Sequence, residues 1–236
     1  PLQFYNKYEN IIVSVDNDRV NGISKLLQID KPPRVILLDD CFQHRKLTLG
    51  LSILLTDFSN LFSSDYLLPL GNLREPASSS KRADIVIVTK CPTDIGEIRK
   101  NKIKNKLNLK LSQKLFFSSI EYSKSVIFKN KQVSFIDFIK NKFVLVTGLA
   151  SSEHIVDYLS ENNCDFEHKK FNDHHDYTLQ DFEKINPLLN ILTTEKDYAK
   201  LTKIFPKREI YYLPISVNIE SNKLFDKIIL DYCNIS

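Results

Sequence analysis

The stretch that decides the fold is Arg34-Val35-Ile36-Leu37-Leu38-Asp39-Asp40-Cys41-Phe42-Gln43-His44-Arg45. Its run of Val, Ile and Leu predicts a strand, buried on both faces, that ends at two adjacent acids. Two carboxylates are costly to bury without a positive partner, and a divalent cation with oxygen ligands is the obvious candidate. A solvated Asp-Asp pair at a strand end is the alternative, and the stretch alone favours neither interpretation.

The composition is ordinary for a globular protein. The chain has 236 residues, of which 42% are hydrophobic and 26% are charged, enough for one large or two small domains. No apolar run approaches the ~18 residues of a membrane helix. Four scattered cysteines lack zinc spacing and favour a reduced, cytoplasmic setting. A net charge of +4 is too small to indicate nucleic acid, but it suits a phosphorylated substrate.

Apolar strands alternate with helices along the chain, which predicts βαβ units and a mostly parallel sheet. Several strands end in polar groups, as at Thr89-Lys90, Thr147-Gly148 and Thr193-Thr194. Ligands bind at the carboxyl ends of strands in open α/β sheets. We therefore expect these groups to share one sheet edge with Asp39-Asp40. Further predictions are strands at 11–15 and 34–40, a helix over 18–27, and two β segments at 115–120 and 125–133 that form a hinge.

Two loops carry further ionisable groups. Pro76 holds Glu75 extended, so Arg74 and Glu75 are fixed for phosphate or metal contact, with a loop-bracing ion pair as the alternative. In Phe171-Asn172-Asp173-His174-His175-Asp176-Tyr177, two adjacent histidines point opposite ways. One is predicted to face a site as a general base with a carboxylate partner. A structural role and a metal site remain alternatives for this loop.

These segments together resemble the tetraacyldisaccharide 4'-kinase family, the lipid A kinases of Gram-negative bacteria. The matching stretches follow in the family's order: Val35–Leu47, Leu67–Pro76, Arg82–Lys90, Val146–Gly148, Phe171–Tyr177 and Thr193–Leu201. The resemblance implies a P-loop NTPase-like, mostly parallel sheet flanked by helices, with a smaller C-terminal α/β lobe joined by a β linker. The expected division is 1–114 for the acidic part of the nucleotide-binding core, 115–135 for the linker and 136–236 for the C-terminal lobe.

The implied activity is transfer of the ATP γ-phosphate, with Mg²⁺, to the 4'-hydroxyl of an acylated glucosamine disaccharide 1-phosphate, forming lipid IVA. The implied location is peripheral, on the cytoplasmic side of the inner membrane, with no nucleic acid as partner. Asp39 and Asp40 would hold the metal. The implied catalytic residues are His174, Asp173, Asp40 and Glu75. The implied substrate-binding residues are Gln43, His44, Arg74 and His175.

The sequence departs from the family pattern in one major respect. Its five dispersed glycines exclude a G-x-x-x-x-G-K-[ST] phosphate loop, and Cys41 stands where many relatives have glycine. We expect the chain to be an N-terminally truncated fragment that has no useful kinase activity alone, while the parent protein is active. The rival hypotheses are a non-catalytic paralogue or interaction domain, and a different P-loop phosphotransferase or GTPase.

Overall fold

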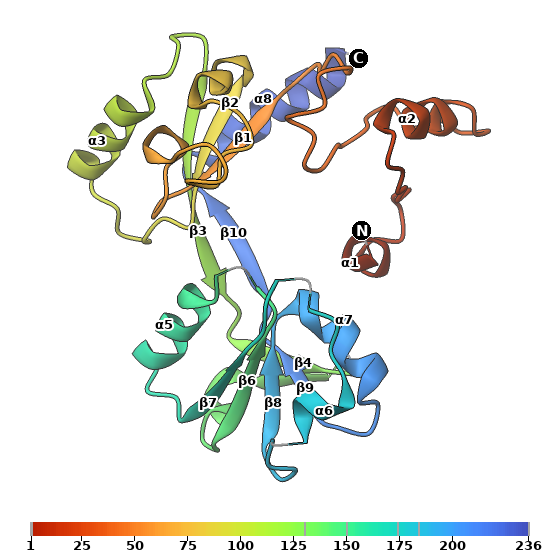
Figure 1. The fold of residues 1–236 in the computed structure, drawn as a ribbon, viewed down its shortest axis with the longest axis vertical. Coiled ribbons are helices and arrows are strands. Elements are labelled where there is room, and N and C mark those ends of the chain that lie inside the picture. The colour runs from red at the N-terminus through yellow and green to blue at the C-terminus, as the bar shows by residue number, and fades with distance from the viewer. Residues whose placement is uncertain (1, 130, 150, 174, 184, 236) are drawn as a thin grey trace. The chain divides into compact units, whose positions relative to one another are not determined.

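The computed structural model describes residues 2–129, 131–149, 151–173, 175–183 and 185–235, and the chain divides into two compact units. The first unit holds Glu9–Glu121 and the residues from Val217 onward (Figure 1). The second unit holds Leu2–Tyr8 and Tyr122–Ser216. The chain therefore leaves the first unit once, after Glu121, and returns to it for its last segment.

The first unit is built on a four-stranded sheet in the order β1-β2-β3-β10. Its strands are β1 (Ile53–Asp57), β2 (Ile85–Thr89), β3 (Lys114–Tyr122) and β10 (Ile215–Ile219). The pairs β1–β2 and β2–β3 are parallel. The helices are α2 (Arg19–Leu27), α3 (Glu97–Leu107) and α8 (Asn222–Ile235), with 3-10 turns η1 (Phe62–Ser64) and η2 (Ala77–Arg82).

The central strand β2 is covered on its two faces by α3 and α8, two helices that lie far apart in the sequence. Val86 and Val88 pack on one face with Ile103 and Leu107 of α3. The alternate residues Ile85 and Ile87 pack on the other face with the partly buried Phe225, Ile228 and Ile229 of α8. All four strand side chains are at most 5% exposed. Because both faces are buried, the strand is a continuous apolar run without alternation.

The second unit has a six-stranded sheet in the order β5-β4-β9-β8-β6-β7. Its strands are β4 (Ser125–Phe128), β5 (Lys131–Ser134), β6 (Phe143–Thr147), β7 (Phe166–Lys170), β8 (Asn190–Thr193) and β9 (Ile210–Tyr212). Strands β7, β6, β8 and β9 pair in parallel, whereas β4 is antiparallel to both β5 and β9. The helices are α1 (Leu2–Lys7), α4 (Phe135–Phe138), α5 (Glu153–Glu161), α6 (Leu179–Phe182) and α7 (Glu195–Ile204).

Two predicted strands are wrong. Residues 11–15 and 34–40 form no strand, and the side chain of Leu37 is 92% exposed. Apolar composition favours burial, but a strand also needs a neighbouring backbone to pair with. No described backbone hydrogen bond involves residues 35–38. The acidic pair therefore follows an extended, unpaired segment.

The predicted single sheet edge is also wrong, because the strands belong to two sheets. Thr89-Lys90 ends a strand of the first sheet, whereas Thr147-Gly148 and Thr193-Thr194 end strands of the second. The helix predicted over 18–27 is confirmed, since α2 begins after Asp18, whose side chain accepts from the backbone N–H groups of Val20 and Asn21. No helix in the described ranges is both long and apolar enough to span a bilayer.

Candidate functional site

The acidic stretch forms an exposed turn in the first unit. Asp39 and Asp40 are both exposed, and Asp40 has a left-handed backbone with φ of 47°. The backbone N–H of His44 donates to the Cys41 carbonyl over 2.9 Å, which closes the turn. Cys41 is buried beneath it, and this burial raises the pKa of its thiol. The turn therefore presents two carboxylates to solvent above an apolar anchor.

The Arg74-Glu75 loop meets this turn. The Arg74 guanidinium donates to the Asp40 carboxylate over 2.9 Å, although 34 residues separate them. Both side chains are more than half exposed, so this pair contributes only about 0–1 kcal/mol to stability. The pair matters because it places the Arg74-Glu75 loop against the Asp39-Asp40 turn, two stretches that stand out separately in the sequence.

Arg82 fixes Glu75 and was missed by the sequence analysis. Its guanidinium forms two hydrogen bonds to the Glu75 carboxylate, of 2.9 and 3.1 Å. It also donates to the Phe42 carbonyl over 3.0 Å and lies 4.5 Å from the centroid of the Phe42 ring. The Arg82 hydrogen bonds lower the pKa of Glu75. Glu75 is therefore held ionised, in a fixed position beside the acidic turn.

Gln43 and His44 lie on the same turn and are exposed. No described side-chain hydrogen bond involves either residue. The structure thus joins Asp40, Arg74 and the Glu75–Arg82 pair, and leaves Gln43 and His44 beside them without a described side-chain bond.

The histidine loop belongs to the second unit. Asp173 accepts from the Lys196 ammonium over 2.8 Å. His174 lies outside the described residues. The His175 ring stacks on Phe171 at 4.7 Å, and its Nε2 lies 3.0 Å from the Asp181 carboxylate. The bond to His175 is the main cause of the lowered pKa of Asp181. His175 is therefore held by its neighbours within the loop.

A buried carboxylate anchors the base of this loop. Asp197, in the first turn of α7 and 2% exposed, accepts from the Gly148 backbone N–H and from the Thr194 hydroxyl, each over 2.9 Å. A Cβ on Gly148 would lie only 2.6 Å from the hydroxyl oxygen of Tyr177. Burial raises the pKa of Tyr177, and the nearby Asp197 charge adds to this effect. Asp197 therefore joins the ends of β6 and β8, next to Tyr177 of the histidine loop.

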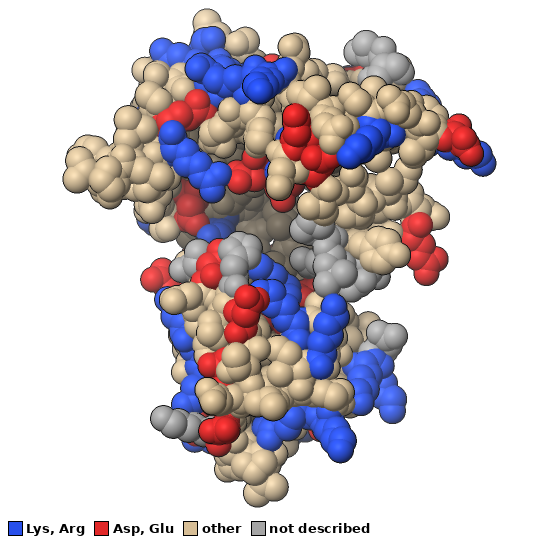
Figure 2. Space-filling model, turned by 45° about the vertical axis from the view of Figure 1, so that its right-hand side comes forward, with Lys and Arg blue, Asp and Glu red and all other residues tan. Residues whose placement is uncertain are grey.

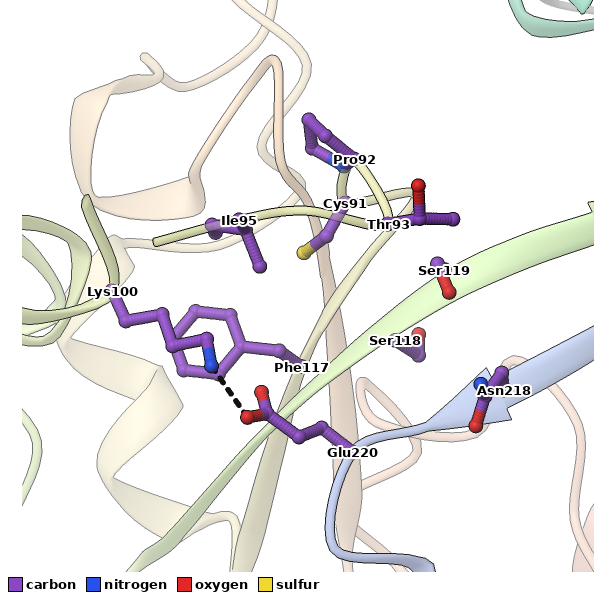
Figure 3. A pocket seen from close by; sticks show the side chains of 10 residues that line it. All are labelled: Cys91, Pro92, Thr93, Ile95, Lys100, Phe117, Ser118, Ser119, Asn218 and Glu220. Atoms are coloured by element: carbon purple, nitrogen blue, oxygen red, sulfur yellow. Dashed lines mark hydrogen bonds and ion pairs between the residues drawn. The ribbon is translucent and has the colours of Figure 1, made fainter. Parts of the chain in front are cut away.

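In the first unit, the carboxyl ends of β1 and β2 form a second polar cluster. Lys90 ion-pairs with Asp57 over 2.7 Å. Burial opposes ionisation of Asp57, but hydrogen bonds from Lys90 and Ser59 outweigh it and lower its pKa. A hollow of about 200 Å³ opens beside the loop after β2. It is lined by Cys91 and Thr93 of that loop, Phe117 and Ser118 of β3, and Glu220 (Figure 3). The sequence indicated Lys90 as a polar residue at the end of a strand, but it gave no indication of Asp57.

Comparison with known proteins identifies the family. Residues 1–234 match the family model described as LpxK, tetraacyldisaccharide-1-P 4'-kinase. The chain belongs to this kinase family. A tetraacyldisaccharide 4'-kinase of Flavobacterium johnsoniae is 41% identical over 98% of this chain and 69% of its own length. One from Bacteroides fragilis is 40% identical over 94% of this chain and 65% of its own length.

A solved LpxK structure supports the same assignment. The crystal structure of the "apo" form of LpxK from Aquifex aeolicus in complex with ATP superposes with a TM-score of 0.65 and 26% identity, covering 89% of this chain and 61% of that one. The predicted P-loop kinase fold, the ATP-dependent kinase class and the family resemblance are therefore confirmed. The chain spans about two thirds of the length of the relatives it matches.

The carboxylates of this LpxK-family chain suit a magnesium site that substrate phosphates complete, rather than one made of protein ligands alone. No cluster of three or more His, Cys, Asp or Glu side chains with metal-binding geometry occurs in the described part of the chain. Mg²⁺ in kinases is held by one or two carboxylates together with substrate phosphates. Two adjacent exposed carboxylates, Asp39 and Asp40, fit that arrangement.

Proposed function

We propose that the protein transfers the γ-phosphate of ATP to the 4'-hydroxyl of an acylated glucosamine disaccharide 1-phosphate, giving lipid IVA, at the cytoplasmic face of the inner membrane. Family membership and the names of the relatives support the reaction. The observation that carries the assignment of residues is the 2.9 Å contact between Arg74 and Asp40. It joins the two conspicuous ionisable loops of the first unit in one cluster.

In the reaction, the sugar 4'-oxygen bonds to the γ-phosphorus, the bond from that phosphorus to the ADP oxygen breaks, and the hydroxyl proton leaves to a base. Positioning and electrostatic stabilisation supply nearly all of the catalysis in such transfers. Arg74 suits contact with phosphate oxygens, because a guanidinium binds them through two parallel hydrogen bonds. The two hydrogen bonds from Arg82 fix the Glu75 carboxylate, which supports a role for it as a hydrogen-bond acceptor near the reacting groups.

Asp39 and Asp40 would hold Mg²⁺, which when bound neutralises charge on the phosphates. Gln43 and His44 are exposed on the same turn and would contact the sugar or its phosphate. The hollow beside the loop after β2 would take part of the nucleotide, because the Lys100 ammonium and the hydroxyls of Thr93 and Ser119 line it. Ligands of open α/β sheets bind at this end of the strands.

For the proton, we assign the base to the Asp173-His174 pair of the second unit. A histidine with a carboxylate partner is basic enough to accept a hydroxyl proton near neutral pH. The packing of His175 against Phe171 and its bond to Asp181 support a positioning role for His175 in substrate binding. This leaves the neighbouring histidine for proton transfer.

The test uses the complete gene product, ATP, Mg²⁺ and the tetraacyldisaccharide 1-phosphate in detergent micelles, with mass spectrometry of the product. We expect a product heavier by one phosphate. Asp40→Asn should lower kcat by about 100-fold or more, the usual cost of removing one electrostatic contact to the reacting group. Asp30→Asn, at an exposed acid of the same unit, is the matched control and should leave kcat unchanged. If the folded complete protein does not phosphorylate the disaccharide, the proposed function is wrong.

A further inference from the structure

The positive charge of the chain is concentrated in one short segment of the first unit. Residues 98–114 hold seven basic side chains and no acidic one, so the remaining residues carry a net −3 although the whole chain carries +4. This segment is most of α3 and its connection to β3. Figure 2 shows Lys and Arg side chains gathered at the upper end of the first unit, where that connection runs in Figure 1. Such a concentration produces a local positive potential that attracts anions.

Most of these cations have no acidic partner. Lys100 is engaged, since it forms ion pairs with Glu97 and Glu220. Five others are exposed and take part in no ion pair among the described residues: Lys102, Lys104, Lys106, Lys110 and Lys114. Lys102 and Lys106 are four residues apart on one helix, where like charges repel. This repulsion opposes the gain from Lys104 and Lys106 in the last turn of α3, and Lys110 and Lys114 lie beyond the helix.

Exposed apolar side chains flank the lysines. Ile98 is 77% exposed and precedes Lys102 and Lys106 on the same ridge of the helix, at four-residue spacing. Leu111, in the turn after the helix, is fully exposed at 104%. The apolar face of α3 is already buried in the core through Ile103 and Leu107. Ile98 and Leu111 are therefore apolar side chains that remain exposed to solvent in the folded unit.

This surface is fixed to the loop that carries the candidate site. Gln113, only 8% exposed, donates to the carbonyls of Ser80 and Ala83 over 2.9 and 2.8 Å. Its side-chain oxygen accepts from the Lys110 backbone N–H over 2.9 Å. Between Ser80 and Ala83 lies Arg82, which holds Glu75. Gln113 therefore joins the turn after α3 to the segment that carries Arg82, and Arg82 in turn bonds Glu75.

We propose that Lys102, Lys106, Lys110 and Lys114, with Ile98 and Leu111, form a docking surface for the anionic phosphate head groups of a lipid bilayer. The proposal rests on the proposed function, because a substrate with four acyl chains is held in a bilayer. Clustered lysines bind anionic head groups, and adjacent apolar side chains insert among them. A nucleic-acid surface instead favours arginine and aromatic groups that read or stack on bases.

The test is co-sedimentation of the complete gene product with vesicles of neutral phosphatidylcholine, with and without 30% phosphatidylglycerol. The variant changes Lys102, Lys106, Lys110 and Lys114 to Gln. A matched control changes four exposed lysines of the second unit that have no described ion pair: Lys131, Lys170, Lys203 and Lys207. We expect the first variant to bind anionic vesicles about 100-fold more weakly, the control to bind like wild type, and the corresponding Lys→Arg variant to retain binding.

Equal loss of binding in the test and control variants would overturn the proposal, as would equal binding to both vesicle types. Retention of RNA in place of anionic vesicles would identify a nucleic-acid surface instead. Turnover of substrate in detergent micelles tests the proposed function separately from the docking surface. The quadruple Gln variant should keep wild-type turnover there while it loses vesicle binding. Absence of micellar turnover in the wild type would refute the proposed function and leave the vesicle result standing.

Discussion

Replacing Arg82 with alanine should destabilise the first unit by about 2–3 kcal/mol. The side chain is one third exposed, so its fork to Glu75 is partly screened and contributes about 1 kcal/mol. The hydrogen bond to the Phe42 carbonyl contributes about 1 kcal/mol, and the contact with the Phe42 ring about 0.5–1 kcal/mol. The midpoint of thermal unfolding should fall by roughly 5–10 °C.

Arg99→Ala is the matched control. Arg99 also lies 4.5 Å from a ring centroid, that of Phe58, but it makes no described ion pair. Its loss should cost only about 0.5–1 kcal/mol. Thermal unfolding followed by circular dichroism measures both variants. Arg82→Lys keeps the charge but loses the fork, so its stability should lie between those of wild type and Arg82→Ala. If Arg82→Ala is no less stable than Arg99→Ala, the inferred role of Arg82 is wrong.

The ion pair between Arg82 and Glu75 predicts that the free energy of unfolding depends on pH. The folded-state pKa of Glu75 is lowered mainly by its hydrogen bonds from Arg82. The stabilisation is therefore present above the unfolded-state pKa of about 4.3 and is lost as the pH falls through the lower folded-state pKa. Wild type should exceed Glu75→Gln in free energy of unfolding at pH 7, and this difference should shrink as the pH falls below about 4.3. A difference that persists at low pH would contradict an ionic origin.

Two further predictions concern the second unit. Gly148→Ala should destabilise it by about 1–3 kcal/mol, because the added Cβ would overlap the buried Tyr177 hydroxyl. Gly96→Ala, where an added Cβ meets nothing within 4 Å, should cost less than 1 kcal/mol, and equal losses in chemical denaturation would show that no overlap exists. His174→Ala should reduce kcat without loss of stability, whereas His175→Ala should lower stability by about 1–2 kcal/mol, because it removes the bond to Asp181 and the stacking on Phe171. Unchanged turnover in both histidine variants would refute the general-base assignment.

Local signals in the sequence predicted individual elements well. The Asp18 cap marked the start of α2, and the unbroken apolar run of β2 marked a strand buried on both faces. The same kind of run at 34–40 gave a wrong prediction, because composition does not specify a pairing partner. Strand β10 was missed, although Ile215–Ile219 alternates apolar and polar residues as a strand does.

The candidate site was only partly predictable for a related reason. Asp39, Asp40, Arg74 and Glu75 stand out in the sequence as ionisable groups in unusual contexts. Arg82 does not, because nothing in the serine-rich stretch before it marks a partner for its charge. Its role depends on the Phe42 carbonyl 40 residues away, a contact that only the folded chain reveals.

The return of the chain to its first unit has a consequence for protein synthesis. The sheet of that unit gains β10, and its second face gains α8, only after residues 215–235 emerge from the ribosome. The second unit, in contrast, has all its segments, α1 included, once Ser216 has been made. Domains fold as units during translation. The inserted unit can therefore fold first, while Ile85, Ile87 and Phe116 stay uncovered until α8 is made. Loss of α8 would destabilise the first unit, which carries the acidic turn, rather than the unit that carries the histidine loop.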